Sequence, residues 1–185
     1  MSKKAGQRND TAKPEVVLVL GGTRSGKSDW ARRYVEDRYS QPVFLATAEA
    51  RDAEMQERIA RHRQERGPHW GLIEEPREIT AALTELERRP QADAVLVDCL
   101  TMWLTNVLLT EGESGVKRRA GELLAVLRDP PCSLVLVANE VGMGIVPEYE
   151  LGRRFRDLAG WLNQRVAAAA DRVVFVAAGL PLFLK

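Results

Sequence analysis

Five short and almost purely apolar runs limit what this chain can fold into. They cover residues 16–20, 43–46, 94–97, 134–138 and 173–177. Each run has the length of a strand and little polar alternation, which is typical of strands covered by protein on both faces of a parallel sheet. Helical patterns lie between the runs, so we expect an α/β protein with a mostly parallel central sheet flanked by helices. Such sheets bind ligands beyond the carboxyl ends of their strands.

Two further segments give expectations of their own. Apolar residues recur at spacings of three and four from Leu151 to Ala169, with Pro147 just before this stretch, which predicts one long helix packed on one side. The stretch TEGESGVK, residues 110–117, combines glycines with polar side chains. It is therefore predicted to be a mobile surface loop.

The totals favour one soluble globular domain. A chain of 185 residues has room for one core, which we assign to residues 15–185, and the polar residues 1–14 are expected to form a disordered tail. A net charge of +1 gives the surface no general attraction for nucleic acid. No run of about 18 apolar residues and no signal peptide is found, so no membrane insertion is expected.

The two cysteines indicate the compartment. Cys99 and Cys132 lie in or beside apolar runs, which predicts buried thiols and not a disulfide framework. A reducing, cytoplasmic location is therefore expected.

A phosphate-binding motif follows the first apolar run. GGTRSGKS fits the pattern G-x-x-x-x-G-K-[ST], and it lies between a predicted strand and a predicted helix, as its mechanism requires. The motif comprises Gly21, Gly22, Thr23, Arg24, Ser25, Gly26, Lys27 and Ser28. Its backbone N–H groups and the helix N-terminus would bind phosphates, and Lys27 would reach the β and γ phosphates. The Ser28 hydroxyl would ligate Mg²⁺.

Asp98 is the second candidate for this site. It ends the apolar run at 94–97 and so falls at the carboxyl edge of a central strand, where a carboxylate that supports Mg²⁺ belongs. An aspartate that caps the following helix is the alternative, and the phosphate-binding motif favours the metal role.

His62 belongs to a predicted helix rich in charge, RDAEMQERIARHRQER at residues 51–66. Four residues at spacings of four, three and four share one face of this helix: Met55, Ile59, His62 and Arg66. His62 therefore points with the apolar residues, towards protein or a cleft. A packed histidine and a nucleophilic imidazole that attacks a phosphate both fit this placement.

With these residues assembled, the chain resembles a family nearly end to end, the bifunctional adenosylcobinamide kinases and adenosylcobinamide-phosphate guanylyltransferases of cobalamin biosynthesis. Four strings carry the resemblance: GGTRSGKS at 21–28, ATAEARDAEMQERIARHR at 46–63, VDCLTMWLTN at 97–106 and NEVGMGIVP at 139–147. The last is the most specific. It argues against two other hypotheses, a P-loop kinase of another small metabolite without a covalent intermediate and a nucleotide-controlled switch.

The resemblance implies a RecA-like P-loop domain, a homotrimer and two successive reactions on one corrinoid. The family phosphorylates adenosylcobinamide with ATP or GTP, then transfers GMP from GTP to that phosphate, releasing pyrophosphate and giving adenosylcobinamide-GDP. The second step passes through a covalent guanylyl-histidine. The family's histidine lies in a string R-I-x-x-H, which RIARHR matches at His62.

The resemblance also implies nucleotide contacts outside the motif. They fall on Thr47, Ala48 and Glu49, on Glu65, Arg66, Gly67 and Pro68, on Glu74, and on Asp98 as the metal-side carboxylate. Arginines that can neutralise a triphosphate are Arg24 together with Arg58, Arg61, Arg63 or Arg66. Asn139 and Glu140 end a predicted strand and would either meet the corrinoid side chain or the transferred phosphoryl group, or cap the next helix.

Overall fold

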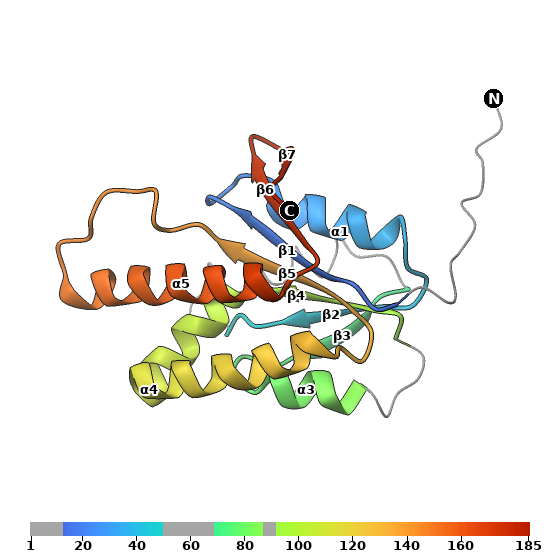
Figure 1. The fold of residues 1–185 in the computed structure, drawn as a ribbon, viewed down its shortest axis with the longest axis horizontal. Helices are drawn as coiled ribbons and strands as arrows, with labels where there is room; N and C mark the ends of the chain where they lie inside the picture. Colours follow the sequence, from blue (N-terminus) through green and yellow to red (C-terminus); the bar gives the residue numbers. More distant parts are fainter. Residues whose placement is uncertain (1–12, 50–68, 87–91) are drawn as a thin grey trace.

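The computed structural model describes residues 13–49, 69–86 and 92–185, and within these ranges the chain forms a seven-stranded sheet (Figure 1). The strands are β1 (Val16–Gly21), β2 (Pro42–Ala46), β3 (Gly71–Glu74), β4 (Ala94–Asp98), β5 (Ser133–Asn139), β6 (Arg172–Ala177) and β7 (Leu180–Phe183). Their order is β3-β2-β4-β5-β1-β6-β7. Every pairing is parallel except that of β6 with β7. All the predicted apolar runs are strands, so the mostly parallel sheet is confirmed.

Helices cover both faces of this sheet. They are α1 (Lys27–Glu36), α3 (Ile79–Leu86), α4 (Leu100–Arg128) and α5 (Glu150–Ala169). In Figure 1, α1 lies on one face, and α3, α4 and α5 lie on the other. The predicted long helix is α5, whose buried face includes Leu158, Leu162 and Val166.

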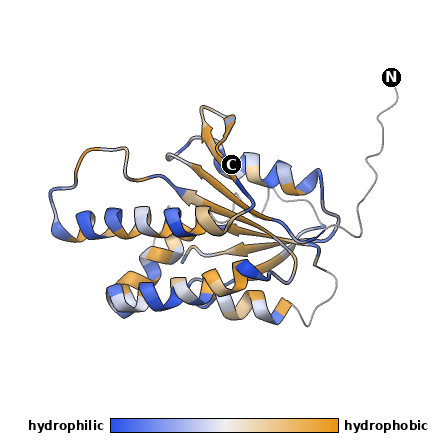
Figure 2. Ribbon diagram, viewed as in Figure 1, coloured by the Kyte–Doolittle hydropathy of each residue, from blue (hydrophilic) through white to orange (hydrophobic). Residues whose placement is uncertain are grey.

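The sheet has two cores because successive side chains of a strand point to opposite faces. Val17 and Val19 of β1 belong to the cluster that contains Ala31 and Val35 of α1. Leu18, between them, belongs to the cluster formed with α3, α4 and α5. Figure 2 shows the consequence, since the strands are hydrophobic along their length whereas the helices carry hydrophilic residues on their outer sides.

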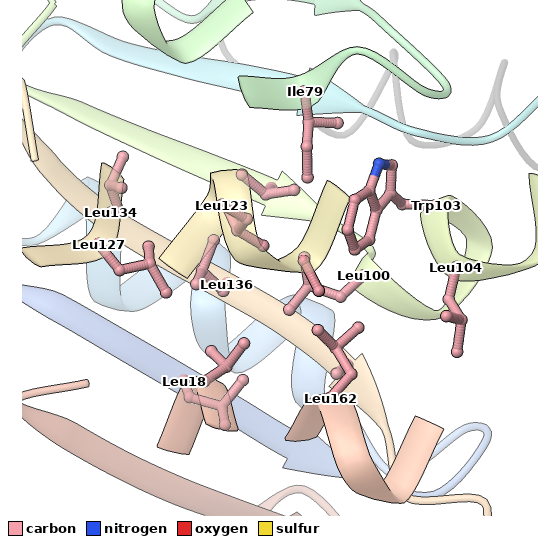
Figure 3. Packing of buried hydrophobic residues seen from close by; sticks show 14 of the residues in the cluster. Leu18, Ile79, Leu100, Trp103, Leu104, Leu123, Leu127, Leu134, Leu136 and Leu162 are labelled. Atoms are coloured by element: carbon pink, nitrogen blue, oxygen red, sulfur yellow. The ribbon is translucent and has the colours of Figure 1, made fainter. Parts of the chain in front are cut away.

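The larger core runs along α4 from Leu100 to Leu127 (Figure 3). Trp103 is fully buried there, in the same cluster as Ile79 of α3 and Leu162 of α5. Its indole Nε1–H donates to the Arg77 carbonyl oxygen at 2.8 Å. The packing therefore fixes the first turns of α4, which follow directly on the carboxyl end of β4.

The prediction of a mobile loop at residues 110–117 is wrong. The segment lies within α4, and Gly112, with φ 69° and ψ −170°, is the one residue inside that helix with non-helical backbone angles. A positive φ suits glycine, so Gly112 joins two helical segments across a kink where another residue would be strained. Glu111 accepts from Arg118 Nη2 at 2.6 Å and from Arg119 Nη2 at 3.0 Å. Glu111, one of the polar residues of this segment, therefore forms ion pairs across the kink.

The beginning of β1 is held by a polar cluster. The hydroxyl of Tyr34 donates to the Glu15 carboxylate at 2.8 Å, and Arg172 forms an ion pair with the same carboxylate. Burial, with the hydrogen bond and charge of Glu15, raises the pKa of Tyr34 to about 12. The neutral phenol is thus favoured in the folded protein.

We expect this cluster to make the protein sensitive to alkaline pH. Because the folded pKa of Tyr34 lies above the unfolded value of about 10, its contribution is fully present below pH 10 and is lost as pH rises through about 12. The loss in the free energy of unfolding is on the order of 2–3 kcal/mol. Urea denaturation between pH 9 and about 11.5 measures it. Tyr34→Phe should flatten the decline; Tyr149→Phe, at a side chain that is 80% exposed, should leave it as in the wild type.

The two cysteines behave as predicted. Cys99 and Cys132 are both free and buried. Burial raises the pKa of each thiol to about 11, so both are protonated at neutral pH. Among the described helices, none has the length and apolar character needed to cross a membrane.

Candidate functional site

The parallel sheet brings most of the predicted site residues to one edge. The phosphate-binding motif follows β1, Asp98 ends β4 and Asn139 ends β5. Thr47 follows β2, and Glu74 ends β3. Because these strands are parallel, their carboxyl ends share an edge, which is where ligands of such sheets bind.

The motif forms a tight loop between β1 and α1. Gly26 has φ 88° and Arg24 has φ 60°. The Ser25 N–H donates to the Gly22 carbonyl oxygen at 3.2 Å, and the first helical bond runs from the Trp30 N–H to the Gly26 carbonyl oxygen at 2.9 Å. Gly26 is the N-cap of α1 and has no side chain to occupy its first N–H groups. The end of the helix is therefore open to an anion.

The first glycine is required by close packing. A Cβ atom built on Gly21 would lie 2.5 Å from both Ser25 Oγ and the Val176 carbonyl oxygen. The loop therefore folds back onto β1 and β6. An alanine at Gly21 would push the loop away from the sheet.

Lys27 lies at the centre of this loop. Its side chain is only 8% exposed, and Nζ donates to the Gly22 carbonyl oxygen at 3.1 Å. Burial lowers the pKa of Lys27, and the nearby Asp98 and Cys99 act in the opposite direction. The ammonium group is thus held inside the loop, near the carboxylate that the sequence predicts for the same site.

A buried network fixes the strand end that carries Asp98. The Thr47 hydroxyl donates to the Cys99 carbonyl oxygen at 2.7 Å and accepts from the Cys99 N–H at 2.8 Å. The Thr47 N–H donates to the Asp98 carbonyl oxygen at 3.3 Å. Asn106 Nδ2 donates to the Thr47 carbonyl oxygen at 2.8 Å and to the Pro76 carbonyl oxygen at 3.1 Å. These bonds join the ends of β2 and β4 to α4.

This network gives Thr47 a structural role. Its side chain is fully buried, and its hydroxyl, N–H and carbonyl groups all have protein partners. The described contacts give it a role in holding the site together, and a contact of Thr47 with nucleotide stays a prediction. The role of Asn106 was missed, because an asparagine inside a helical pattern carries no local signal.

Asn139 and Glu140 lie beside the phosphate loop. Asn139 pairs with Gly21 in the sheet, and the Glu140 N–H donates to the Gly21 carbonyl oxygen at 3.0 Å. The alternative that they cap the following helix is wrong, because α5 begins ten residues later and its N-cap is Tyr149. Glu140 instead accepts from the Gly142 N–H at 2.8 Å. The Asn139 N–H donates to the Thr101 hydroxyl at 2.7 Å.

Two buried polar atoms at this edge have no hydrogen-bond partner among the described residues. They are Ser25 Oγ in the phosphate loop and Asn139 Oδ1 at the end of β5. Buried polar atoms in folded proteins are almost always bonded. Both atoms lie at the neighbouring ends of β1 and β5, the edge that holds the phosphate loop.

The segment after Asn139 exposes apolar side chains. Met143 is 79% exposed, Ile145 is 97% exposed and Val146 is 58% exposed. They belong to the string that carries the family resemblance most specifically. The segment that follows β5 therefore carries exposed apolar surface.

The remaining predicted residues divide into two groups. Ala48 and Glu49 are half-buried after β2, and Glu74 is exposed at the end of β3, in register with Ala46. Those at residues 50–68 lie outside the described residues: His62, Glu65, Arg66, Gly67 and Pro68, with Arg58, Arg61 and Arg63. Their roles stay predictions.

The fold of this chain is similar to that of a solved structure. A crystal structure of the RadB recombinase resembles this chain with a TM-score of 0.50 and 14% identity, over 89% of this chain and 74% of that one. At this identity the likeness concerns the fold alone, and it confirms the RecA-like P-loop architecture.

Two known proteins are more similar to this chain in sequence. The bifunctional adenosylcobalamin biosynthesis protein CobP of Pseudomonas aeruginosa is 46% identical over 171 residues, 91% of this chain and 96% of that protein. The bifunctional adenosylcobalamin biosynthesis protein CobU of Escherichia coli K12 is 39% identical over 183 residues, 92% of this chain and 99% of that protein. A family model described as cobinamide kinase / cobinamide phosphate guanyltransferase matches residues 17–184. The chain belongs to this family.

Proposed function

We propose that this protein phosphorylates adenosylcobinamide with ATP or GTP and then transfers GMP from GTP to the new phosphate, giving adenosylcobinamide-GDP and pyrophosphate. The observation that carries the proposal is the loop of residues 21–28, which buries Lys27 beside an open helix N-terminus. Membership of the kinase and guanyltransferase family supplies the substrate class.

In the kinase step the protein contributes positioning and charge. The hydroxyl oxygen of the aminopropanol group attacks the γ phosphorus, the bond to the β–γ bridging oxygen breaks, the nucleoside diphosphate leaves, and the hydroxyl proton is released to solvent. The loop N–H groups would bind the β phosphate, and Lys27 would neutralise charge on the β and γ phosphates. Asn139, which ends β5 beside this loop, would meet the corrinoid side chain or the transferred phosphoryl group.

The donors at this edge fit Mg²⁺. Ser28 offers a hydroxyl at the start of α1, and Asp98 offers a carboxylate at the end of β4. One carboxylate and one hydroxyl, completed by phosphate oxygens and water, form the oxygen ligand set that Mg²⁺ takes in phosphoryl-transfer enzymes. When bound, the ion would neutralise phosphate charge.

For the transferase step we propose a covalent intermediate on His62. A nitrogen of its imidazole attacks the α phosphorus of GTP, and the bond to pyrophosphate breaks. The corrinoid phosphate oxygen then attacks the same phosphorus and releases the imidazole. Two displacements let one cleft present pyrophosphate first and the corrinoid phosphate second. The support is the match of RIARHR to the family's histidine string.

The surroundings of the site fit an acceptor that is both apolar and charged. The exposed side chains of Met143, Ile145 and Val146, in the segment after β5, would offer contact area to a corrinoid. We further propose that the protein acts in the cytoplasm as a homotrimer, as the family resemblance implies.

Labelling with GTP radiolabelled at the α phosphate tests the covalent step. Wild-type protein with Mg²⁺ should retain label after denaturation, in a bond that is acid-labile and alkali-stable. His62→Ala should retain none. The chain has one other histidine, so His69→Ala is a matched control that should be labelled like the wild type.

Other outcomes have clear meanings. If His62→Ala were labelled and His69→Ala were not, the nucleophile would be His69, and its assignment to His62 would be wrong. An unlabelled wild-type protein that still phosphorylates a small acceptor would be a P-loop kinase without a covalent intermediate. Nucleotide hydrolysis that no acceptor stimulates would indicate a nucleotide-controlled switch.

A further inference from the structure

We infer that the hairpin formed by β6 and β7 braces the phosphate loop, and that Gly179 in its turn is a positioning residue for triphosphate binding. The inference rests on the proposed function, since it concerns the same loop. It assigns a task to a hairpin whose second strand contributes nothing to the core: Leu180 is 72% exposed and Leu182 is 59% exposed.

The turn of the hairpin contacts the centre of the phosphate loop. The Gly179 N–H donates to the Ser25 carbonyl oxygen at 2.8 Å. A Cβ atom built on Gly26 would lie 3.0 Å from Gly179 Cα, so the two backbones are packed directly against each other. Ser25 and Gly26 form the part of the loop that leads into Lys27.

The backbone of the turn is adapted to this approach. Ala177 pairs with Leu180, so the turn has two residues, and both have positive φ: 50° at Ala178 and 79° at Gly179. Positive φ at both positions is typical of a type I′ turn. Alanine rarely adopts this conformation, and residues that do so are found where the surrounding structure determines the backbone.

A second contact ties the hairpin to α1. Phe183 of β7 meets Trp30 of α1 edge to face, with ring centroids 6.3 Å apart, and Trp30 stacks on Tyr34 at 5.1 Å. Figure 1 shows β6 and β7 beside α1. The hairpin therefore contacts both the phosphate loop and the helix that follows it.

These contacts have a direct consequence for phosphate binding. In a trans peptide the carbonyl oxygen and the next N–H point in opposite directions. A hydrogen bond that fixes the Ser25 carbonyl oxygen towards Gly179 thus fixes the Gly26 N–H towards the interior of the loop. Donors that are oriented before the ligand arrives bind it more tightly, because less conformational entropy is lost on binding.

Substitution of Gly179 tests the brace. Alanine is disfavoured at a φ of 79°, although its Cβ would meet no atom within 4 Å, so Gly179→Ala should alter the turn without a steric clash. We expect affinity for a fluorescent ATP analogue to fall about tenfold and the KM for ATP to rise by a similar factor, while the KM for the corrinoid is unchanged. Gly179→Asn should restore most of the affinity, because asparagine tolerates positive φ.

The control is Gly121→Ala, in α4, where the added methyl group also meets nothing within 4 Å. It should bind the analogue as the wild type does. If Gly179→Ala fails to fold, Phe183→Ala carries the test, since it removes an exposed aromatic contact and should weaken binding two- to threefold, within the range of an aromatic pair.

The brace is overturned if Gly179→Ala binds the analogue as tightly as Gly121→Ala does, or if asparagine at this position restores thermal stability but not affinity. Failure of the proposed function has a different signature. A wild-type protein that binds the analogue but modifies no corrinoid refutes the function and leaves the brace to be judged by the binding data. A wild-type protein that binds no nucleotide refutes both.

Discussion

Lys27→Met is expected to reduce phosphoryl transfer by about 10²–10³-fold while the protein stays folded. Lys27 is 8% exposed, and its ammonium group donates to the Gly22 carbonyl oxygen inside the phosphate loop, where its charge is worth more than in water. Methionine keeps most of the length of the side chain and removes the charge. Because burial already disfavours that charge and lowers the pKa of Lys27, its removal should not destabilise the fold. Acceptor-dependent production of ADP from ATP measures the effect.

Lys117→Met is the matched control. Lys117 is exposed on α4, so the same substitution there should leave kcat and KM at wild-type values. A Lys27→Met variant with more than about a tenth of wild-type kcat would contradict the assignment, because loss of a buried charge that contacts the transition state costs more than tenfold. An unfolded variant would assign Lys27 to structure, and circular dichroism distinguishes the cases.

The phosphate loop could be predicted because its signal is local. The motif, the preceding apolar run and the following helix are contiguous, and the structure joins them through β1 and α1. Asp98 could be predicted for a related reason. A carboxylate that ends a buried apolar run lies at the carboxyl edge of a parallel sheet wherever that strand pairs. The strand order, which separates Asp98 from the loop by β5, needed the structure.

The two strands missed by the sequence lie at the edges of the sheet. β3 (Gly71–Glu74) has four residues and is mostly exposed, and β7 (Leu180–Phe183) is exposed throughout and contains Pro181. Neither has the burial that gives a long apolar run. A signal for β7 existed in Ala178–Gly179, since a glycine after one short apolar run and before another favours a hairpin. The same turn contains Gly179, whose N–H contacts the phosphate loop.

The helical path through residues 110–117 could not be found from composition. Its glycines and polar residues are typical of a loop, and the decisive contacts are the ion pairs of Glu111 with Arg118 and Arg119. These pairs span a kink that depends on the positive φ of Gly112. Asn139 shows a similar limit, because its place beside Gly21 comes from the pairing of β1 with β5, more than a hundred residues apart in the chain.

Trp103→Ala should cause the largest loss of stability, on the order of 3–5 kcal/mol in the free energy of unfolding. Trp103 is fully buried, and truncation would leave a cavity between α3 and α4 and an unpaired Arg77 carbonyl oxygen. Trp103→Phe fills most of the volume but removes the donor, so its cost should be about 1–3 kcal/mol. Urea denaturation followed by far-ultraviolet circular dichroism measures both variants.

Trp161→Ala provides the comparison for this prediction. Trp161 is half-buried on α5, with the Arg165 guanidinium carbon 4.8 Å from its ring centroid, so its truncation should cost about 1 kcal/mol. Equal losses at Trp103 and Trp161 would contradict the central place given to Trp103. The site should respond as well, because the first turns of α4 carry Thr101 and Asn106, which hold Asn139 and Thr47. In conditions where Trp103→Ala remains folded, its affinity for ATP should therefore be lower than that of Trp161→Ala. The reason is that the packing of Trp103 positions the first turns of α4, which hold the strand ends at the phosphate-binding edge.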